Sequence, residues 1–174
     1  MARWPEFQLE GEAPQWVNPA ARMKMGREHI VPLPKAAVAM LRALRPQSSG
    51  EVVCPCSRPG RPISENTFKG ALRVLQHLGL FAGDHDPHGF RKTASTLLHE
   101  EGFDLGVIEA QLAHKEPGVA GVCNRALYLD ERRQLMRAYA DLLQGLKAGR
   151  PWHELLAAVK GNRNHHKDAN FHRN

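Results

Sequence analysis

Side chains able to bind anions, transfer protons or act as nucleophiles follow one another in a definite order along the chain. His88 and Arg91 form a His-x-x-Arg motif, His114 stands 23 residues beyond Arg91, and Cys123 stands 9 residues beyond His114. Lys24 lies far upstream. Arg can bind two phosphate oxygens at once, and His and Lys are common general acids or bases. A single His-x-x-Arg often arises by chance, with a His that only satisfies a helix terminus, so the ordered set carries the information.

The elements that position these residues can be predicted from apolar spacing and turn residues. Two β-type runs, residues 15–19 and 27–33, predict a hairpin with Lys24 beside its turn. A helix is predicted over residues 88–101, which puts the His-x-x-Arg motif in its first turn. Further helices are predicted to begin at Pro34, Ser64, Asp104 and Asp130, residues that favour a helix start.

The composition is that of an ordinary globular domain with a basic surface. Of 174 residues, 42% are hydrophobic and 24% are charged, and the formal net charge is +6. This charge permits a nucleic-acid partner without proving one. No apolar run approaches the ~20 residues that span a bilayer, and three Cys favour a reducing compartment over a disulfide framework. We therefore expect a cytoplasmic protein that does not associate with membranes.

Four stretches resemble the tyrosine recombinases of the phage or genomic-island integrase kind, in the family's order and at its spacing. They are Arg22-Met23-Lys24-Met25 with His29 to Leu33, His88-Gly89-Phe90-Arg91, Gln111-Leu112-Ala113-His114-Lys115, and Asn124-Arg125-Ala126 with Tyr128 to Arg133. The resemblance implies a mainly α fold with a small antiparallel β-sheet (α+β), the recombinase catalytic domain without its first segment, over residues 1–147. Residues 148–174 are a basic tail rich in His and Asn, which we expect to be partly disordered.

The resemblance also implies a role for each chemical side chain. Arg91 would clamp the scissile phosphate, and Lys24 would be the general acid. His88 would assist proton transfer, and His114 would hydrogen-bond a phosphate oxygen. The nucleophilic Tyr of the family, which holds the DNA as a covalent ester, falls at Cys123. The basic residues expected to contact DNA are Arg22, Arg27, Lys92, Lys115 and Arg125. No metal or other cofactor would be required.

Plainer alternatives remain open for several of these residues. Lys24 could be a solvated charge of the hairpin, His114 could merely end its helix, and Arg91 could bind a surface carboxylate. A metal-dependent hydrolase built on His85, Asp86 and His88 is a further alternative, which the recombinase spacing disfavours. The pair Cys54 and Cys56 has no second Cys pair with which to complete a zinc site.

Two departures from the family predict a defective enzyme. Cys123 has a shorter side chain than Tyr, and a misplacement of even ~1 Å can cost about 100-fold in rate. The first catalytic Arg of the family precedes the part that this chain resembles, and Tyr128 matches a non-catalytic Tyr of the family. Our hypothesis is a truncated or decayed recombinase domain that binds DNA without cutting it. The alternative is a non-catalytic DNA-binding accessory module.

The expected partner is double-stranded DNA of the attachment-site type. By analogy with the family, the chain would also associate with itself on DNA or with a full-length integrase. Because intact integrases clamp DNA with further domains, we predict binding by this chain that is weak, poor in sequence specificity and sensitive to salt.

Overall fold

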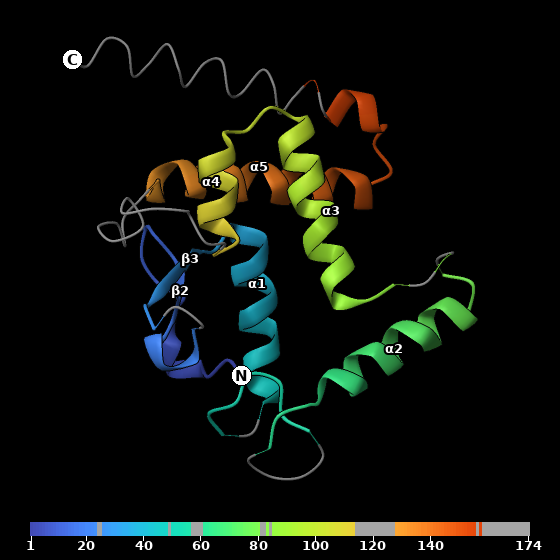
Figure 1. Cartoon of the computed structure of the whole chain (residues 1–174). Helices are drawn as coiled ribbons and strands as arrows, with labels where there is room; N and C mark the ends of the chain where they lie inside the picture. The colour runs from blue at the N-terminus through green and yellow to red at the C-terminus, as the bar shows by residue number, and fades with distance from the viewer. Residues whose placement is uncertain are drawn as a thin grey trace, which may run out of the picture.

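The computed structural model describes residues 1–23, 26–48, 50–56, 61–80, 83, 85–113, 128–155 and 157. The fold is mainly helical, with one small antiparallel sheet beside the helices (Figure 1), which confirms the predicted α+β class. The strands are β1 (Phe7–Gln8), β2 (Gln15–Asn18) and β3 (His29–Pro32). The 3-10 helices are η1 (Trp4–Glu6), η2 (Ala20–Arg22) and η3 (Arg45–Gln47). The α-helices are α1 (Lys35–Leu44), α2 (Glu65–His77), α3 (Pro87–Glu100), α4 (Leu105–Gln111) and α5 (Leu129–Lys147).

The predicted hairpin is present, with strands slightly shorter than expected. β2 and β3 pair antiparallel, with Trp16 opposite Val31 and Asn18 opposite His29. β1 pairs with the other edge of β2, which gives the strand order β1-β2-β3. In the connection from β2 to β3, the Asn18 Nδ2 donates to the Met23 Sδ at 2.9 Å. The strand pairing and this contact together hold the described part of the connection, as far as Met23.

One hydrophobic cluster joins the sheet to α1. Trp4, Leu9, Val38 and Val53 are buried together in it. The backbone N–H of Trp4 donates to the Glu51 carbonyl at 2.8 Å, so the N-terminal segment is connected to the loop beyond α1. Burial of large apolar side chains supplies the main favourable free energy for this half of the fold.

A second hydrophobic cluster joins α3, α4 and α5. Leu98, Val107, Ile108 and Leu135 are buried in it, and the last two are fully covered. The apolar spacing of the sequence predicts the inward faces of α4 and α5. Burial confirms the face of α4, and confirms Leu135 and Leu142 on α5, whereas Leu143 and Leu146 are exposed. α5 also contacts β3 and α1, and therefore connects the helical half to the sheet (Figure 1).

Capping side chains determine where most of these helices begin. Ser64 and Asp104 cap α2 and α4 as predicted, each accepting a backbone N–H at 3.2 Å. Asp86 caps α3, which begins one residue before the predicted start. α5 differs from the prediction, because Tyr128 precedes it in a left-handed conformation with a φ of 57°. Asp130 lies inside the first turn, where its charge favours the helix N-terminus.

α2 extends away from the other helices (Figure 1). The sequence predicts this helix with one apolar face, and the helix is confirmed. Leu72 is buried, whereas Phe68 is 45% exposed and Leu78 is 65% exposed. Apolar spacing predicts that a helix is amphipathic, but it does not predict what packs on the apolar face. No helix in the described parts of the chain is both long and apolar enough to cross a membrane.

Candidate functional site

The His-x-x-Arg motif occupies the first turns of α3. Pro87 opens the helix, and Asp86 caps it by accepting the Gly89 N–H at 2.6 Å. His88 and Arg91 are three residues apart, so they are neighbours on the helix surface. Both residues are exposed. The fold therefore presents a His and an Arg together to solvent at a well-capped helix start.

The guanidinium of Arg91 reaches the end of α4. One Nη donates to the carbonyl of Leu112, the C-cap residue of that helix. The last carbonyls of a helix lack intrahelical partners and carry partial negative charge. A guanidinium has five N–H donors, so this bond leaves others for an anion. Arg91 is thus an exposed cation that is already anchored by its own fold.

The residues of the alternative metal site have contacts of another kind. Asp86 caps α3, and the His85 ring stacks on Phe90 with centroids 6.3 Å apart and an interplanar angle of 18°. Among the described residues, no group of three or more His, Cys, Asp and Glu could hold a metal ion. The observed contacts of Asp86 and His85 are those of a helix start.

Several predicted site residues lie outside the described residues, namely Lys24, His114, Lys115, Cys123 and Arg125. Arg27 and Lys92 are described, and both are exposed. Arg27 precedes β3, and Lys92 follows Arg91 on α3. Their assignment as DNA contacts stays a prediction.

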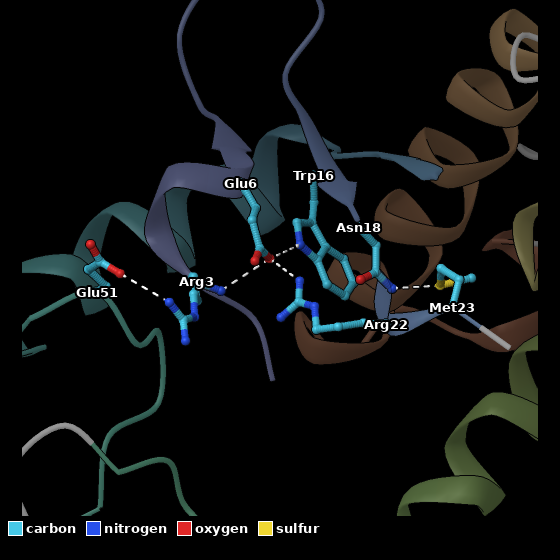
Figure 2. Close-up of polar contacts among 7 residues, drawn as sticks. All are labelled: Arg3, Glu6, Trp16, Asn18, Arg22, Met23 and Glu51. Carbon is cyan, nitrogen blue, oxygen red and sulfur yellow. Dashed lines mark hydrogen bonds and ion pairs between the residues drawn. The ribbon is translucent and has the colours of Figure 1, made fainter. Parts of the chain in front are cut away.

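Arg22, the remaining predicted DNA contact, is paired with Glu6 at the end of the hairpin (Figure 2). The Glu6 Oε2 accepts from the Trp16 indole N–H at 3.0 Å, from the Arg3 backbone N–H at 3.2 Å, and from the Arg22 guanidinium. Burial by itself raises the pKa of Glu6, but these hydrogen bonds and the Arg22 charge outweigh burial and lower the pKa. Arg22 is therefore already paired with a carboxylate of its own fold, which partly offsets the charge that it could offer to a phosphate.

A polar junction between β3, α4 and α5 was not predicted from the sequence. Arg132 of α5 donates from Nε to the Gln111 Oε1 at 3.0 Å, and from an Nη to the Ile30 carbonyl. The His29 Nε2 lies 3.2 Å from the Gln111 carbonyl oxygen. His29 and Arg132 fall within the stretches that resemble the family, which is the only signal that singled them out. Their contacts join residues up to 102 positions apart, so no local pattern indicates them.

Burial shapes the charges in this junction. Arg132 is 3% exposed, and burial lowers its pKa to about 10, which leaves it charged at neutral pH. Burial, followed by the charges of Arg132 and Arg91, lowers the pKa of His29. The His29 ring is therefore neutral at pH 7, and its Nε2–H can donate to the Gln111 carbonyl. The Arg91 guanidinium lies at the edge of this junction, because it is bonded to the carbonyl of Leu112, the residue after Gln111.

Comparison with known proteins relates this arrangement to one family. Residues 4–124 match the Phage integrase family. The chain is 41% identical over 151 residues to prophage integrase IntA of Escherichia coli K12, which covers 85% of this chain and 35% of that protein. It is 36% identical over 160 residues to the integrase of Enterobacteria phage P4, which covers 82% of this chain and 35% of that protein. The chain thus spans roughly a third of the length of these relatives. No solved structure matches the chain significantly. Because the family match covers residues 4–124, which include the sheet, α1 to α4 and the His-x-x-Arg motif, the chain belongs to the phage integrase family.

Proposed function

We propose that this chain is a DNA-contacting domain of DNA integration and site-specific recombination. Its substrate is double-stranded DNA of the attachment-site type, bound at the face where α3 begins. The observation that carries the proposal is the exposed guanidinium of Arg91, anchored on the end of α4 and three residues from His88. An anchored side chain loses little conformational freedom on binding, and the planar fork of Arg matches two phosphate oxygens.

The proposed chemistry is phosphoryl transfer without a metal or other cofactor. Attack on a phosphodiester builds negative charge on the non-bridging oxygens and on the leaving 5′ oxygen. Arg91 stabilises the charge on the non-bridging oxygens, with His114 as a further hydrogen-bond donor. Lys24 protonates the leaving oxygen, and His88 assists proton transfer at the nucleophile. The roles of Lys24 and His114 rest on the sequence alone.

In this chain the proposed outcome is binding without strand cleavage. Cys123 takes the place of the nucleophilic Tyr. A Cys side chain is shorter than that of Tyr, and a misplacement of the attacking atom by even ~1 Å can cost about 100-fold in rate. Tyr128 is a poor substitute, because its ring packs against α4. A Cβ added at Gly106 would lie 3.4 Å from the Tyr128 Cε2. This packing supports a structural role for Tyr128.

The test of strand cleavage uses nicked DNA duplexes with randomised sequence around the nick, since a nick beside the scissile phosphate traps a covalent adduct. The unaltered chain should shift these duplexes on a native gel and leave no adduct on a denaturing gel. An adduct with the unaltered chain would overturn the proposal that the chain is defective. An adduct formed only by Cys123→Tyr would identify the missing Tyr as the lesion. Absence of an adduct with either protein would mean that restoring a Tyr at position 123 is not sufficient for cleavage.

The test of the binding face compares two charge removals. Arg91→Ala should weaken duplex binding and reduce the slope of log K against log salt by about 0.9, the value for one lost phosphate contact. Arg42→Ala removes the same charge from α1, where Arg42 pairs with Glu10 at 2.7 Å, and should leave the slope unchanged. Equal effects of the two substitutions would mean that net charge, rather than the start of α3, governs binding. Absence of duplex binding at low salt would overturn the proposed function.

A second candidate function is a non-catalytic accessory that binds DNA beside another copy or beside a full-length integrase. Cys123 favours it, since a protein that works only by binding needs no nucleophile. The discriminating protein is Cys123→Tyr fused to the region that precedes the match in an intact relative. Recovered cleavage would favour a decayed enzyme, and binding without cleavage would favour the accessory module.

A further inference from the structure

Arg132 is a cation inside the junction of β3, α4 and α5. It is 3% exposed, and the acceptors of its two hydrogen bonds described above, the Gln111 side chain and the Ile30 carbonyl, are neutral. None of the ion pairs among the described residues includes Arg132. Burying a charge without an opposite charge is unfavourable, and apolar replacements of buried charges are often tolerated. The stability of the fold is therefore a weak reason for an Arg at this position.

The bonds of Arg132 lead to the anchor of Arg91. The Gln111 side chain accepts from Arg132, and the Gln111 carbonyl lies 3.2 Å from the His29 Nε2. The next carbonyl along the chain, that of Leu112, accepts from Arg91. Three contacts from three other elements thus converge on two consecutive residues at the end of α4.

The end of α4 needs such support because of its backbone. The chain leaves the helix through Ala113, whose φ of 52° lies in the left-handed region. This conformation is unfavourable for a residue with a Cβ, so surrounding contacts must hold it. Loss of the Arg132 contact would remove one of these supports, directly beside the Leu112 carbonyl.

We infer that Arg132 is a positioning residue for Arg91. By tying the end of α4 to β3, it fixes the carbonyl that orients the Arg91 guanidinium toward a DNA phosphate. Arg132 itself is buried and does not touch the DNA. The inference rests on the proposed function, in which Arg91 binds phosphate, and it names the residue through which the fold prepares that contact.

The experiment measures binding of a fluorescein-labelled duplex by anisotropy between about 50 and 200 mM salt, where phosphate contacts determine the slope. Arg91→Ala and Arg132→Met should each weaken binding several-fold and reduce the slope by about 0.9, the value for one phosphate contact. The double variant should bind no more weakly than either single variant. Such non-additivity is expected when one residue acts through the other.

Two further variants separate geometry from charge. Arg133→Met removes the neighbouring charge on α5, where Arg133 pairs with Asp130 at 2.5 Å, and should leave the slope unchanged. Arg132→Lys keeps the charge but lacks the planar fork that reaches two acceptors. It should therefore reduce the salt slope by the same amount as Arg132→Met does. Full recovery of slope and affinity by the Lys variant would overturn the inference, because charge alone would then suffice.

Thermal unfolding of every variant shows whether the variant is folded. Binding is then measured well below the midpoint temperature of unfolding. If Arg132→Met does not fold, Gln111→Met takes its place, because it breaks the same connection while leaving the bond from Arg132 to Ile30. It should reduce the salt slope by the same amount. If Arg91→Ala binds as the unaltered chain does, the proposed function fails. If Arg91→Ala weakens binding but Arg132→Met and Gln111→Met do not, or if the effects add, the inference fails and the proposed function stands.

Discussion

Substitutions at Glu6 should destabilise the fold to two clearly different extents. Its Oε2 accepts all three of the hydrogen bonds described above, so the side chain holds η1, β2 and η2 together at the end of the hairpin. Glu6→Gln keeps an oxygen in the same place and removes only the charge. Glu6→Ala removes the acceptor, and leaves the Trp16 indole N–H and the Arg3 backbone N–H without their partner.

The contacts set the size of each loss. Charge-assisted hydrogen bonds are about twice as strong as neutral ones, but Arg22 is 27% exposed, so solvent screens the ion pair. We therefore expect Glu6→Gln to lower the free energy of unfolding by about 1–2 kcal/mol. Glu6→Ala should lower it by about 2–4 kcal/mol, because the Trp16 indole N–H and the Arg3 backbone N–H also lose their acceptor.

The assay is urea unfolding followed by circular dichroism, repeated as the pH is lowered. The folded pKa of Glu6 lies below its ordinary value of 4.5. The stability that the carboxylate contributes is therefore complete above pH 4.5, and is lost as the pH falls through the folded pKa. The difference between the unaltered chain and Glu6→Gln should shrink over that range. Equal losses for the Gln and Ala variants, or a difference that stays constant in acid, would refute this account of the cluster.

Two further predictions concern buried residues. His29→Gln should flatten the pH dependence of stability in mild acid. Burial lowers the folded pKa of His29, so the stability due to the neutral ring is complete above 6.5 and is lost as the pH falls through the folded pKa. Unchanged dependence of the urea midpoint on pH would contradict this. Leu135→Ala should lower the free energy of unfolding by about 2–5 kcal/mol, because Leu135 is 0% exposed. Leu143 lies on the same helix and is 44% exposed, so Leu143→Ala should change the free energy of unfolding by about 0.5 kcal/mol or less. Comparable losses for the two variants would place Leu135 outside the core.

Most of the secondary structure could be predicted because its signals are local. The hairpin follows from alternating strands around a turn, and Ser64 and Asp104 cap the helices that they precede. The start of α5 could not be predicted in this way, because Tyr128 adopts a left-handed conformation against α4. The exposure of Phe68 on α2 likewise depends on what packs nearby, which the spacing of apolar residues does not reveal.

In the candidate site, too, the features with a local signal could be predicted from the sequence, and those that depend on tertiary contacts could not. The placement of His88 and Arg91 side by side could be predicted because both belong to one short motif on one helix. The anchoring of Arg91 on α4, and the junction centred on Arg132, depend on side chains from three separate elements. Such contacts leave no periodic pattern in the sequence. The pairing of Arg22 with Glu6 was hidden for the same reason, since the sequence indicates the charge but not its partner.

The bond between Arg132 and the Ile30 carbonyl also has a consequence for the order in which the fold is made. It closes a loop of 102 positions, whereas the cluster around Trp4 and Val53 lies within the first third of the chain. Long loops close late, because their ends must meet at an entropic cost. On a ribosome that adds about 5–20 residues per second, α5 follows β3 by on the order of 10 s. The nascent sheet and α1 can therefore pack first, and the contacts at the end of α4 that anchors Arg91 are completed only after α5 has been synthesised.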